Sequence, residues 1–301
     1  MSSKPIASDL TVIIPTLGRA CLRESMRAIA DGTVWPAKIV LAHQGTAGEL
    51  DSMLREFAQW GLSVHYVQSD KRSCGSGRNT AIEQVRTTFF ASTDDDCLVD
   101  AHWVEEVRAA LARHPREIVS GRVLASEPGA PSSVTIDEPR LFTRMPLKGN
   151  HFTGGNFGVA LQIFQDVGPF DERPLVRFCE DNEWSYRALA KGYHCRYLPE
   201  ITITHLHWRG NKEMERVYAD YARSQGGWIG RKLREGDWSF LIRLAYESSR
   251  GAKRWLLGSL RRDFNRKIHG RAFVVDMMRG VVIGWNERSA GAPQPGERPA
   301  A

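Results

Sequence analysis

Strand-like runs alternate with helix-like segments from residue 10 to residue 93. Four runs are short and rich in β-branched or aromatic residues, as buried strands are: residues 10–16, 37–44, 62–68 and 87–93. Three helical segments separate them: residues 20–30, 47–61 and 75–85. Because parallel strands need crossover helices, this order predicts an α/β fold with a mostly parallel sheet flanked by helices. Ligands bind such sheets at the carboxyl ends of the strands.

The pattern changes near residue 210. Before it, we expect two more helices, at residues 102–115 and 180–192, and two stretches that contain a strand, at 117–124 and 195–208. Between them we expect a long loop at 126–150 and a glycine-rich turn with a helix at 152–172. After it, strand patterns cease and three basic helical stretches follow. The sequence therefore predicts a domain over residues 1–210 and a basic α-helical C-terminal region over 211–301, with a flexible end.

Composition narrows the class of protein. The chain has 301 residues, of which 42% are hydrophobic, so it is long enough to bury a substantial core. Its five cysteines are odd in number and form no C-x-x-C pair, which favours reduced thiols, a cytoplasmic location and no zinc site. No apolar run is long enough to cross a bilayer, so we expect no integral membrane protein.

Three adjacent carboxylates, Asp94, Asp95 and Asp96, follow the fourth predicted strand. Carboxylates this close disfavour each other's charged form unless a cation or a set of hydrogen-bond donors lies among them. A metal ion, a helix N-terminus and plain solvent are all compatible with the pattern. At a strand end, alternate carboxylates could converge on an oxygen-ligated cation such as Mg²⁺ or Mn²⁺.

Other polar positions also permit two interpretations. Glu180 and Asp181 suit either the acidic first turn of a helix or a general base that takes a proton from a hydroxyl. His205 and His207 share one face of a predicted strand and are either buried or a metal ligand. The glycine-rich turns at 75–79 and 154–156 suit tight turns or, beside Arg78, a diphosphate.

The order of these segments is more informative than any one of them. Seven ordered blocks closely resemble family-2 glycosyltransferases of the GT-A (Rossmann-like) fold over about residues 10–207: "VIIPTLGR", "GRNTAI", "TDDDCLVDAHWVEE", "FTGGNFGV", "VGPFDE", "EDNEWSYRALAKGY" and "YLPEITITH". The resemblance implies an inverting, metal-dependent transfer of a sugar from a nucleoside-diphosphate sugar, with Mn²⁺ or Mg²⁺ as cofactor. The metal chemistry agrees, because a divalent cation would neutralise the charge that grows on the leaving diphosphate.

The resemblance also implies roles for single residues. Asp94 and Asp96 would form the D-x-D metal pair, with His205 as a further ligand, and Asp181 would be the catalytic base, with Glu180 beside it. The residues expected to bind the acceptor are Gly154, Gly155, Asn156 and Trp184. The residues expected to bind the donor nucleotide are Pro15, Thr16, Arg19, His43, Gln44, Arg78, Asn79, Asp94 and Asp95.

One departure affects the donor. After the second strand the family usually carries aspartates that contact the base, whereas this chain has His43 and Gln44 there. The amide of Gln44 can still hydrogen-bond a pyrimidine edge, so we expect UDP or dTDP as the nucleotide. A glycan or lipid-linked intermediate of cell-surface polysaccharide synthesis is the expected acceptor.

Two alternatives remain, a sugar nucleotidyltransferase and a non-catalytic basic relative that binds nucleic acid or membranes. The first would need more basic residues in an N-terminal glycine-rich loop, and the intact aspartates argue against the second; we expect no nucleic-acid partner. The basic C-terminal region intersperses Trp228, Trp238, Trp255 and Leu256 among its charges. It suits either a packed helical subdomain or a peripheral contact with an anionic membrane at its inner face.

Overall fold

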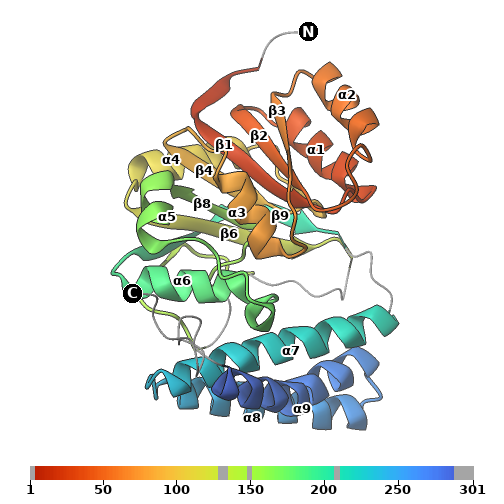
Figure 1. Cartoon of the computed structure of the whole chain (residues 1–301), viewed down its shortest axis with the longest axis vertical. Helices are drawn as coiled ribbons and strands as arrows, with labels where there is room; N and C mark the ends of the chain where they lie inside the picture. The colour runs from red at the N-terminus through yellow and green to blue at the C-terminus, as the bar shows by residue number, and fades with distance from the viewer. Residues whose placement is uncertain (1–3, 128–134, 148–150, 207–210, 288–301) are drawn as a thin grey trace, which may run out of the picture. The chain divides into compact units, whose positions relative to one another are not determined.

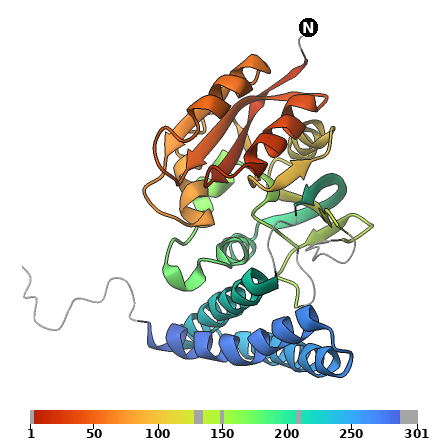
Figure 2. The same ribbon diagram turned by 90° about the vertical axis from the view of Figure 1, so that its right-hand side faces the viewer.

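The computed structural model describes residues 4–127, 135–147, 151–206 and 211–287. The chain divides into two compact units (Figures 1 and 2). The first unit, called the catalytic unit after the residues expected to be catalytic, comprises Met1–Arg173 and Glu180–Trp208, and the C-terminal unit comprises Pro174–Cys179 and Arg209–Ala301. The short segment 174–179 thus belongs to the C-terminal unit, although it lies within the catalytic unit's sequence. His207 and the predicted flexible end lie outside the described residues.

A mixed nine-stranded sheet flanked by helices forms the catalytic unit, which confirms the predicted fold class. Its order is β3-β2-β1-β4-β8-β6-β9-β5, and β7 pairs with β9. The strands are β1 (Ile6–Thr16), β2 (Trp35–His43), β3 (Val64–Gln68), β4 (Phe89–Thr93), β5 (Cys97–Val99), β6 (Glu117–Ala125), β7 (Arg140–Phe142), β8 (Asn156–Ala160) and β9 (His194–His205).

Strand direction divides the sheet. β3, β2, β1 and β4 are all parallel, as the βαβ alternation predicts. β8 runs antiparallel to both β4 and β6 and joins the two halves. β8 and the three-residue strands β5 and β7 are not predicted from the sequence. β8 reads "NFGVA" and runs directly into a helix, so its apolar residues look like part of one helical segment.

The helices of the catalytic unit follow the predicted order. They are α1 (Cys21–Asp31), α2 (Asp51–Gln59), α3 (Cys74–Ile82), α4 (Trp103–Arg113), α5 (Leu161–Val167) and α6 (Glu180–Ala190). α3 begins at a side-chain cap, because the Ser73 hydroxyl accepts a hydrogen bond from the Ser76 amide at 3.1 Å. The first turn of α3 therefore begins at a fixed position a few residues after the carboxyl end of β3, at the sheet edge where ligands would bind.

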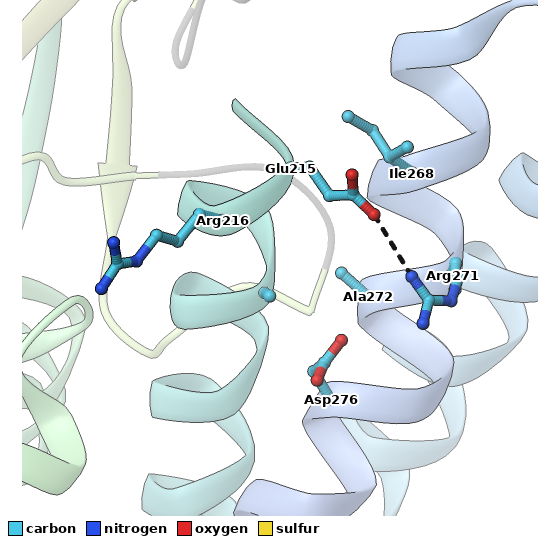
Figure 3. Close-up of a pocket in the computed structure, with 7 residues that line it drawn as sticks. Glu215, Arg216, Ile268, Arg271, Ala272 and Asp276 are labelled. Carbon is cyan, nitrogen blue, oxygen red and sulfur yellow. Dashed lines mark hydrogen bonds and ion pairs between the residues drawn. The ribbon is translucent and has the colours of Figure 1, made fainter. Parts of the chain in front are cut away.

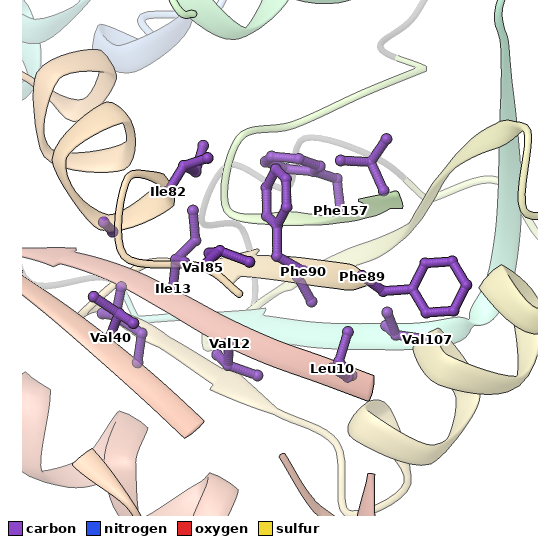
Figure 4. Close-up of a cluster of buried hydrophobic side chains, with 14 of the residues drawn as sticks. Leu10, Val12, Ile13, Val40, Ile82, Val85, Phe89, Phe90, Val107 and Phe157 are labelled. Carbon is purple, nitrogen blue, oxygen red and sulfur yellow. The ribbon is translucent and has the colours of Figure 1, made fainter. Parts of the chain in front are cut away.

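Apolar strand residues and aromatic rings form the core of the catalytic unit. Ile13 of β1, Phe90 of β4 and Phe157 of β8 lie on one face of the sheet, and Val12 of β1 lies on the other (Figure 4). The Phe90 and Phe157 rings meet edge to face at 5.9 Å, a favourable aromatic arrangement. This packing fixes β4, and with it the position at which Asp94 leaves the sheet.

The C-terminal unit is helical. It contains the single-turn helix η1 (Pro174–Val176) and three long helices, α7 (Asn211–Arg234), α8 (Phe240–Leu260) and α9 (Phe264–Asn286). α7 and α9 approach so closely that a Cβ at Gly284 would overlap the Gly227 carbonyl oxygen, and a Cβ at Gly230 would overlap the Val281 carbonyl oxygen. Glycine at these positions therefore lets the two backbones touch.

Trp228 packs inside this unit. Its ring meets Phe240 edge to face at 4.9 Å and is almost fully buried, so it belongs to the helical core and not to an exposed aromatic surface. Trp238, by contrast, is exposed. Among the described residues, no helix combines the length and the apolar character that a membrane span needs.

Candidate active site

Three parallel strands end at one edge of the sheet. The register pairs Thr16 with His43 and Ile13 with Ser92, so the chain leaves β1, β2 and β4 at neighbouring points. The sequence-predicted donor and metal residues at or directly after these strand ends are Pro15, Thr16, Arg19, His43, Gln44, Asp94, Asp95 and Asp96. This is the edge where open α/β sheets bind ligands.

The middle aspartate, Asp95, is buried and supports the first loop. Its carboxylate accepts hydrogen bonds from the Thr16 hydroxyl at 2.7 Å, the Leu17 amide at 3.2 Å and Arg19 at 3.3 Å. Burial raises the pKa of Asp95, while the Thr16 hydrogen bond opposes the rise. Asp95 therefore holds the loop after β1 in place.

The first aspartate, Asp94, is bound to a buried arginine. Arg78 donates from Nη2 to Asp94 Oδ1 at 2.7 Å and from Nη1 to Glu180 Oε1 at 2.8 Å. The Arg78 side chain is only 3% exposed, so its guanidinium joins the strand edge to the start of α6. The sequence predicts that Arg78 contacts a diphosphate, whereas in the structure its guanidinium binds the carboxylates of Asp94 and Glu180.

The glycine turn before β8 leaves room for this network. A Cβ at Gly154 would lie 2.5 Å from the Arg78 guanidinium carbon, and one at Gly155 would lie 2.5 Å from Asp94 Oδ2. Any side chain at either position would displace Arg78 or Asp94. The two glycines are thus required by close packing against the acidic edge.

The third aspartate, Asp96, approaches a histidine from another strand. His205 Nε2 lies 3.6 Å from Asp96 Oδ1, because β5 pairs antiparallel with the end of β9 and matches Cys97 with His205. Within the described part of the chain, Asp96, Cys97 and His205 offer ligand atoms within 4.8 Å of one another. Cys97 was not singled out from the sequence, although it directly follows the aspartates.

Two adjacent carboxylates begin α6. Asp181 Oδ2 accepts a hydrogen bond from the Gly154 amide at 3.0 Å, and its Oδ1 accepts from the Asn182 amide at 2.7 Å. Burial raises the pKa of Asp181, and burial together with the neighbouring Asp181 raises the pKa of Glu180 to about 8. Carboxyl groups with raised pKa values in a polar cluster are candidates for proton transfer.

His43 lies fully buried beneath backbone that approaches it closely. Its Nδ1 is 3.2 Å from the Tyr66 hydroxyl, and its Nε2 is 3.7 Å from the Glu49 carboxylate. Burial lowers the pKa of His43, so the neutral imidazole is favoured. A Cβ at Gly45 would lie 2.5 Å from His43 Nε2, which shows how tightly the following loop covers the ring.

Gln44 and Asn79 both stabilise neighbouring loops. The Gln44 amide donates to the Lys71 and Ser73 carbonyls at 2.6 and 2.7 Å and so holds the turn before α3. The Asn79 amide donates to the Phe170 carbonyl at 2.9 Å and accepts from the Phe170 amide at 2.9 Å. The side-chain nitrogen of Gln44 is therefore already bonded to protein.

Two residues expected to contact the acceptor lie in the core instead. Trp184 has no exposed surface, and its indole donates to the Gly168 carbonyl at 2.9 Å. Asn156 is equally buried; it accepts from the Trp103 indole at 2.8 Å and donates to the Ile201 carbonyl at 2.9 Å. Because burial and protein hydrogen bonds account for both side chains, we do not include them in the proposed acceptor site.

A cavity of about 320 Å³ lies within the C-terminal unit (Figure 3). Glu215 and Arg271 form an ion pair at 3.3 Å across it. The lining residues are Glu215, Arg216, Ala219, Ile268, Arg271, Ala272 and Asp276. None of them is a site residue predicted from the sequence, and opposite charges already pair within the cavity.

The sheet order and its flanking helices define the class of fold, an α/β domain of the GT-A type. The profile described as "Glycosyl transferase family 2" matches residues 11–167, just over half of the chain. The chain therefore belongs to glycosyl transferase family 2. A search of curated protein sequences finds no match.

Solved structures of S. aureus TarS share the fold. Residues 1–349 of TarS in complex with UDP-GlcNAc match with a TM-score of 0.55 and 12% identity, covering 88% of this chain and 90% of that one. The complex of the same fragment with UDP gives the same values. A longer TarS structure matches with a TM-score of 0.53 and 14% identity, covering 87% of this chain and 55% of that one.

Proposed function

We propose that the chain is an inverting glycosyltransferase that moves a sugar from a UDP-sugar to a hydroxyl of a glycan or lipid-linked acceptor. The observation that carries this proposal is the network at the sheet edge. There, Arg78 links Asp94 to Glu180, and the Gly154 amide holds the adjacent Asp181 carboxylate. The network joins a donor-binding edge to a candidate base.

The choice of uridine is supported by the fold neighbours, since TarS structures hold UDP-GlcNAc and UDP. It is also compatible with the replacement of the expected aspartates by His43 and Gln44. A neutral imidazole and an amide add no negative charge beside the base or the diphosphate. We therefore propose that the chain at His43 and Gln44 borders the base; because both side chains are buried, the backbone there would make the contact.

Asp96 and His205 are the residues that would hold a divalent cation. Burial raises the pKa of Cys97 well above its usual value, so this thiol stays protonated and is a poor ligand. The remaining carboxylate oxygen and imidazole nitrogen suit Mn²⁺ or Mg²⁺, so the donor set fits the expected metal. Asp94, the other member of the expected metal pair, binds Arg78 through Oδ1, so its Oδ2 is the oxygen that could join them. A bound cation would neutralise charge on the leaving diphosphate.

Asp181 is the proposed base. In an inverting transfer the acceptor hydroxyl attacks the sugar carbon from the face opposite the leaving diphosphate, and its proton passes to a carboxylate. The Gly154 and Asn182 amides orient the Asp181 carboxylate, and burial makes it a stronger base than a carboxylate in water. One displacement needs one base, so no carboxylate nucleophile is required.

The test is to incubate the full chain with Mn²⁺ and a panel of nucleotide sugars and to measure released nucleoside diphosphate. We expect release from UDP-sugars, and loss of about 10² or more in kcat for Asp181→Asn with donor affinity nearly unchanged. Asp166→Asn is the control, because that carboxylate is exposed and pairs with Lys191. Faster release from a guanosine donor would refute the uridine proposal, and normal turnover in Asp181→Asn would refute the base. Release of pyrophosphate from a sugar phosphate and a nucleoside triphosphate would indicate a nucleotidyltransferase.

A further inference from the structure

The exposed face of α8 is almost free of charge. Nine residues of the helix are exposed, at spacings that repeat every three or four positions, and only one of them is charged. We call these residues the α8 face: Leu241, Ile242, Ala245, Ser249, Ala252, Lys253, Leu256, Ser259 and Leu260. The opposite side of the helix is buried, at Glu247, Gly251 and Gly258.

Large apolar side chains stand out from this face. Ile242, Leu256 and Leu260 are 64%, 62% and 72% exposed. Trp238 just before the helix and Phe264 just after it are also exposed and extend the apolar residues beyond both ends. A row of exposed apolar side chains along one helix face usually marks an interaction site. Ordinary protein surfaces carry single, scattered apolar residues instead.

Positive charge surrounds the same region. Between residues 250 and 267 the chain has seven Lys and Arg and a single acid, Asp263. The Asp263 carboxylate accepts from the Arg266 amide at 3.0 Å and so caps α9. Lys253 lies on the α8 face, and Arg261 and Arg262 are exposed in the turn that follows it. The region therefore combines apolar side chains with a strong excess of positive charge.

An anionic lipid surface satisfies both properties. Apolar side chains of an amphipathic helix enter the boundary between headgroups and acyl chains, while Lys and Arg attract anionic headgroups. A second copy of this chain would cover the apolar residues but bring two sets of positive charges together, which repel. Lys253 can keep its ammonium among the headgroups while its aliphatic stem lies with the apolar residues.

We propose that the α8 face is a docking surface for a bilayer that contains anionic phospholipid. Leu256, Leu260 and Ile242 enter the interface, and Lys253, Arg261 and Arg262 hold the headgroups. The binding is reversible and peripheral, and it concerns this surface alone. The proposal is therefore independent of the proposed donor, metal and base.

The test is co-sedimentation of the full chain with vesicles of phosphatidylcholine alone or mixed with phosphatidylglycerol. We expect binding to the mixed vesicles only, and release at high salt, because the screening length falls from about 10 Å at 0.1 M to about 3 Å at 1 M. Leu256→Glu/Leu260→Glu should weaken binding about 100-fold, since each leucine buried at the interface contributes roughly tenfold. Lys253→Glu/Arg261→Glu leaves these leucines in place and should weaken binding about 25-fold or more, at roughly fivefold for each lost cation.

The matched control is Ile6→Glu/Leu141→Glu, the same kind of change at two exposed apolar residues of the catalytic unit. It should bind vesicles like the wild type. Thermal unfolding of each variant identifies a loss of binding that comes from misfolding, and the charge variant tests the surface again without touching its apolar residues. Equal binding to both vesicle types, or no binding at low salt, would overturn the proposal. A dimer in light scattering that Leu256→Glu/Leu260→Glu dissociates, without vesicle binding by the wild type, would assign the face to a second copy instead.

Discussion

Replacing Arg78 by alanine should be among the most destabilising single changes in the catalytic unit. The guanidinium is 3% exposed and makes two charge-assisted hydrogen bonds, to Asp94 at 2.7 Å and to Glu180 at 2.8 Å. Its removal leaves two carboxylates near each other without their common cation. Breaking a buried ion pair in this way costs about 3–5 kcal/mol of unfolding free energy.

The loss should be visible as a lower unfolding temperature. For a unit of this size, each kcal/mol corresponds to roughly 2–4 °C, so we expect Arg78→Ala to unfold about 6–20 °C below the wild type. The assay is thermal unfolding followed by circular dichroism at neutral pH. Arg78→Lys should fall between the two, because one ammonium keeps the charge but cannot reproduce the planar fork.

The control is Arg23→Ala. Arg23 is also an arginine at 2.8 Å from a carboxylate, that of Glu56, but half of its side chain is exposed. Exposed pairs contribute about 0–1 kcal/mol, so this variant should unfold within a few degrees of the wild type. If Arg78→Ala were no less stable than Arg23→Ala, the buried network would not stabilise the unit and the reasoning above would be wrong.

Three further predictions concern the metal, pH and helix packing. Asp96→Ala should remove Mn²⁺-dependent donor binding in calorimetry, with circular dichroism checking that the variant is folded; undiminished binding would exclude Asp96 as a ligand. Folding raises the pKa of Glu180 from 4.5 to about 8, so wild-type stability should be lost as pH rises through that interval, whereas Glu180→Gln should lose less. Parallel stability–pH curves for the two proteins would contradict this. Gly284→Val forces a side chain against the Gly227 carbonyl and should destabilise the C-terminal unit by about 3 kcal/mol in urea unfolding, while Ala252→Val on an exposed helix face should cost less than about 1 kcal/mol.

The parallel half of the sheet could be predicted because its signal is local. β1, β2 and β4 each contain an apolar run, and the helices α1 and α2 have clear amphipathic patterns. β8 could not be predicted in the same way. Its five residues pair with β4 and β6, and such pairing is decided by neighbours far away in the sequence.

The sequence names candidate site residues but does not show their contacts. The sequence shows three adjacent aspartates and cannot show that each has a different partner. Asp95 meets Thr16, 79 residues earlier in the chain, and Asp96 approaches His205 from the far end of the sheet. The burial of Trp184 could not be predicted either, because an aromatic residue beside two acidic residues is compatible with a site or with the core.

The segment 174–179 has a consequence for how the protein can be divided. The main chain passes between the two units three times, after Arg173, after Cys179 and after Trp208. Val176 is fully buried, and the Phe178 ring meets Tyr221 of α7 edge to face at 5.5 Å.

The residue that follows this segment is Glu180, so the first turn of α6 is tied covalently to a piece of the helical unit. A fragment that stops near residue 210 would keep 174–179 but lose the helices on which it packs. The C-terminal helices therefore cannot be exchanged or removed without affecting the segment 174–179. Grafting or deleting them would remove the packing of the chain immediately before Glu180 and the proposed base Asp181.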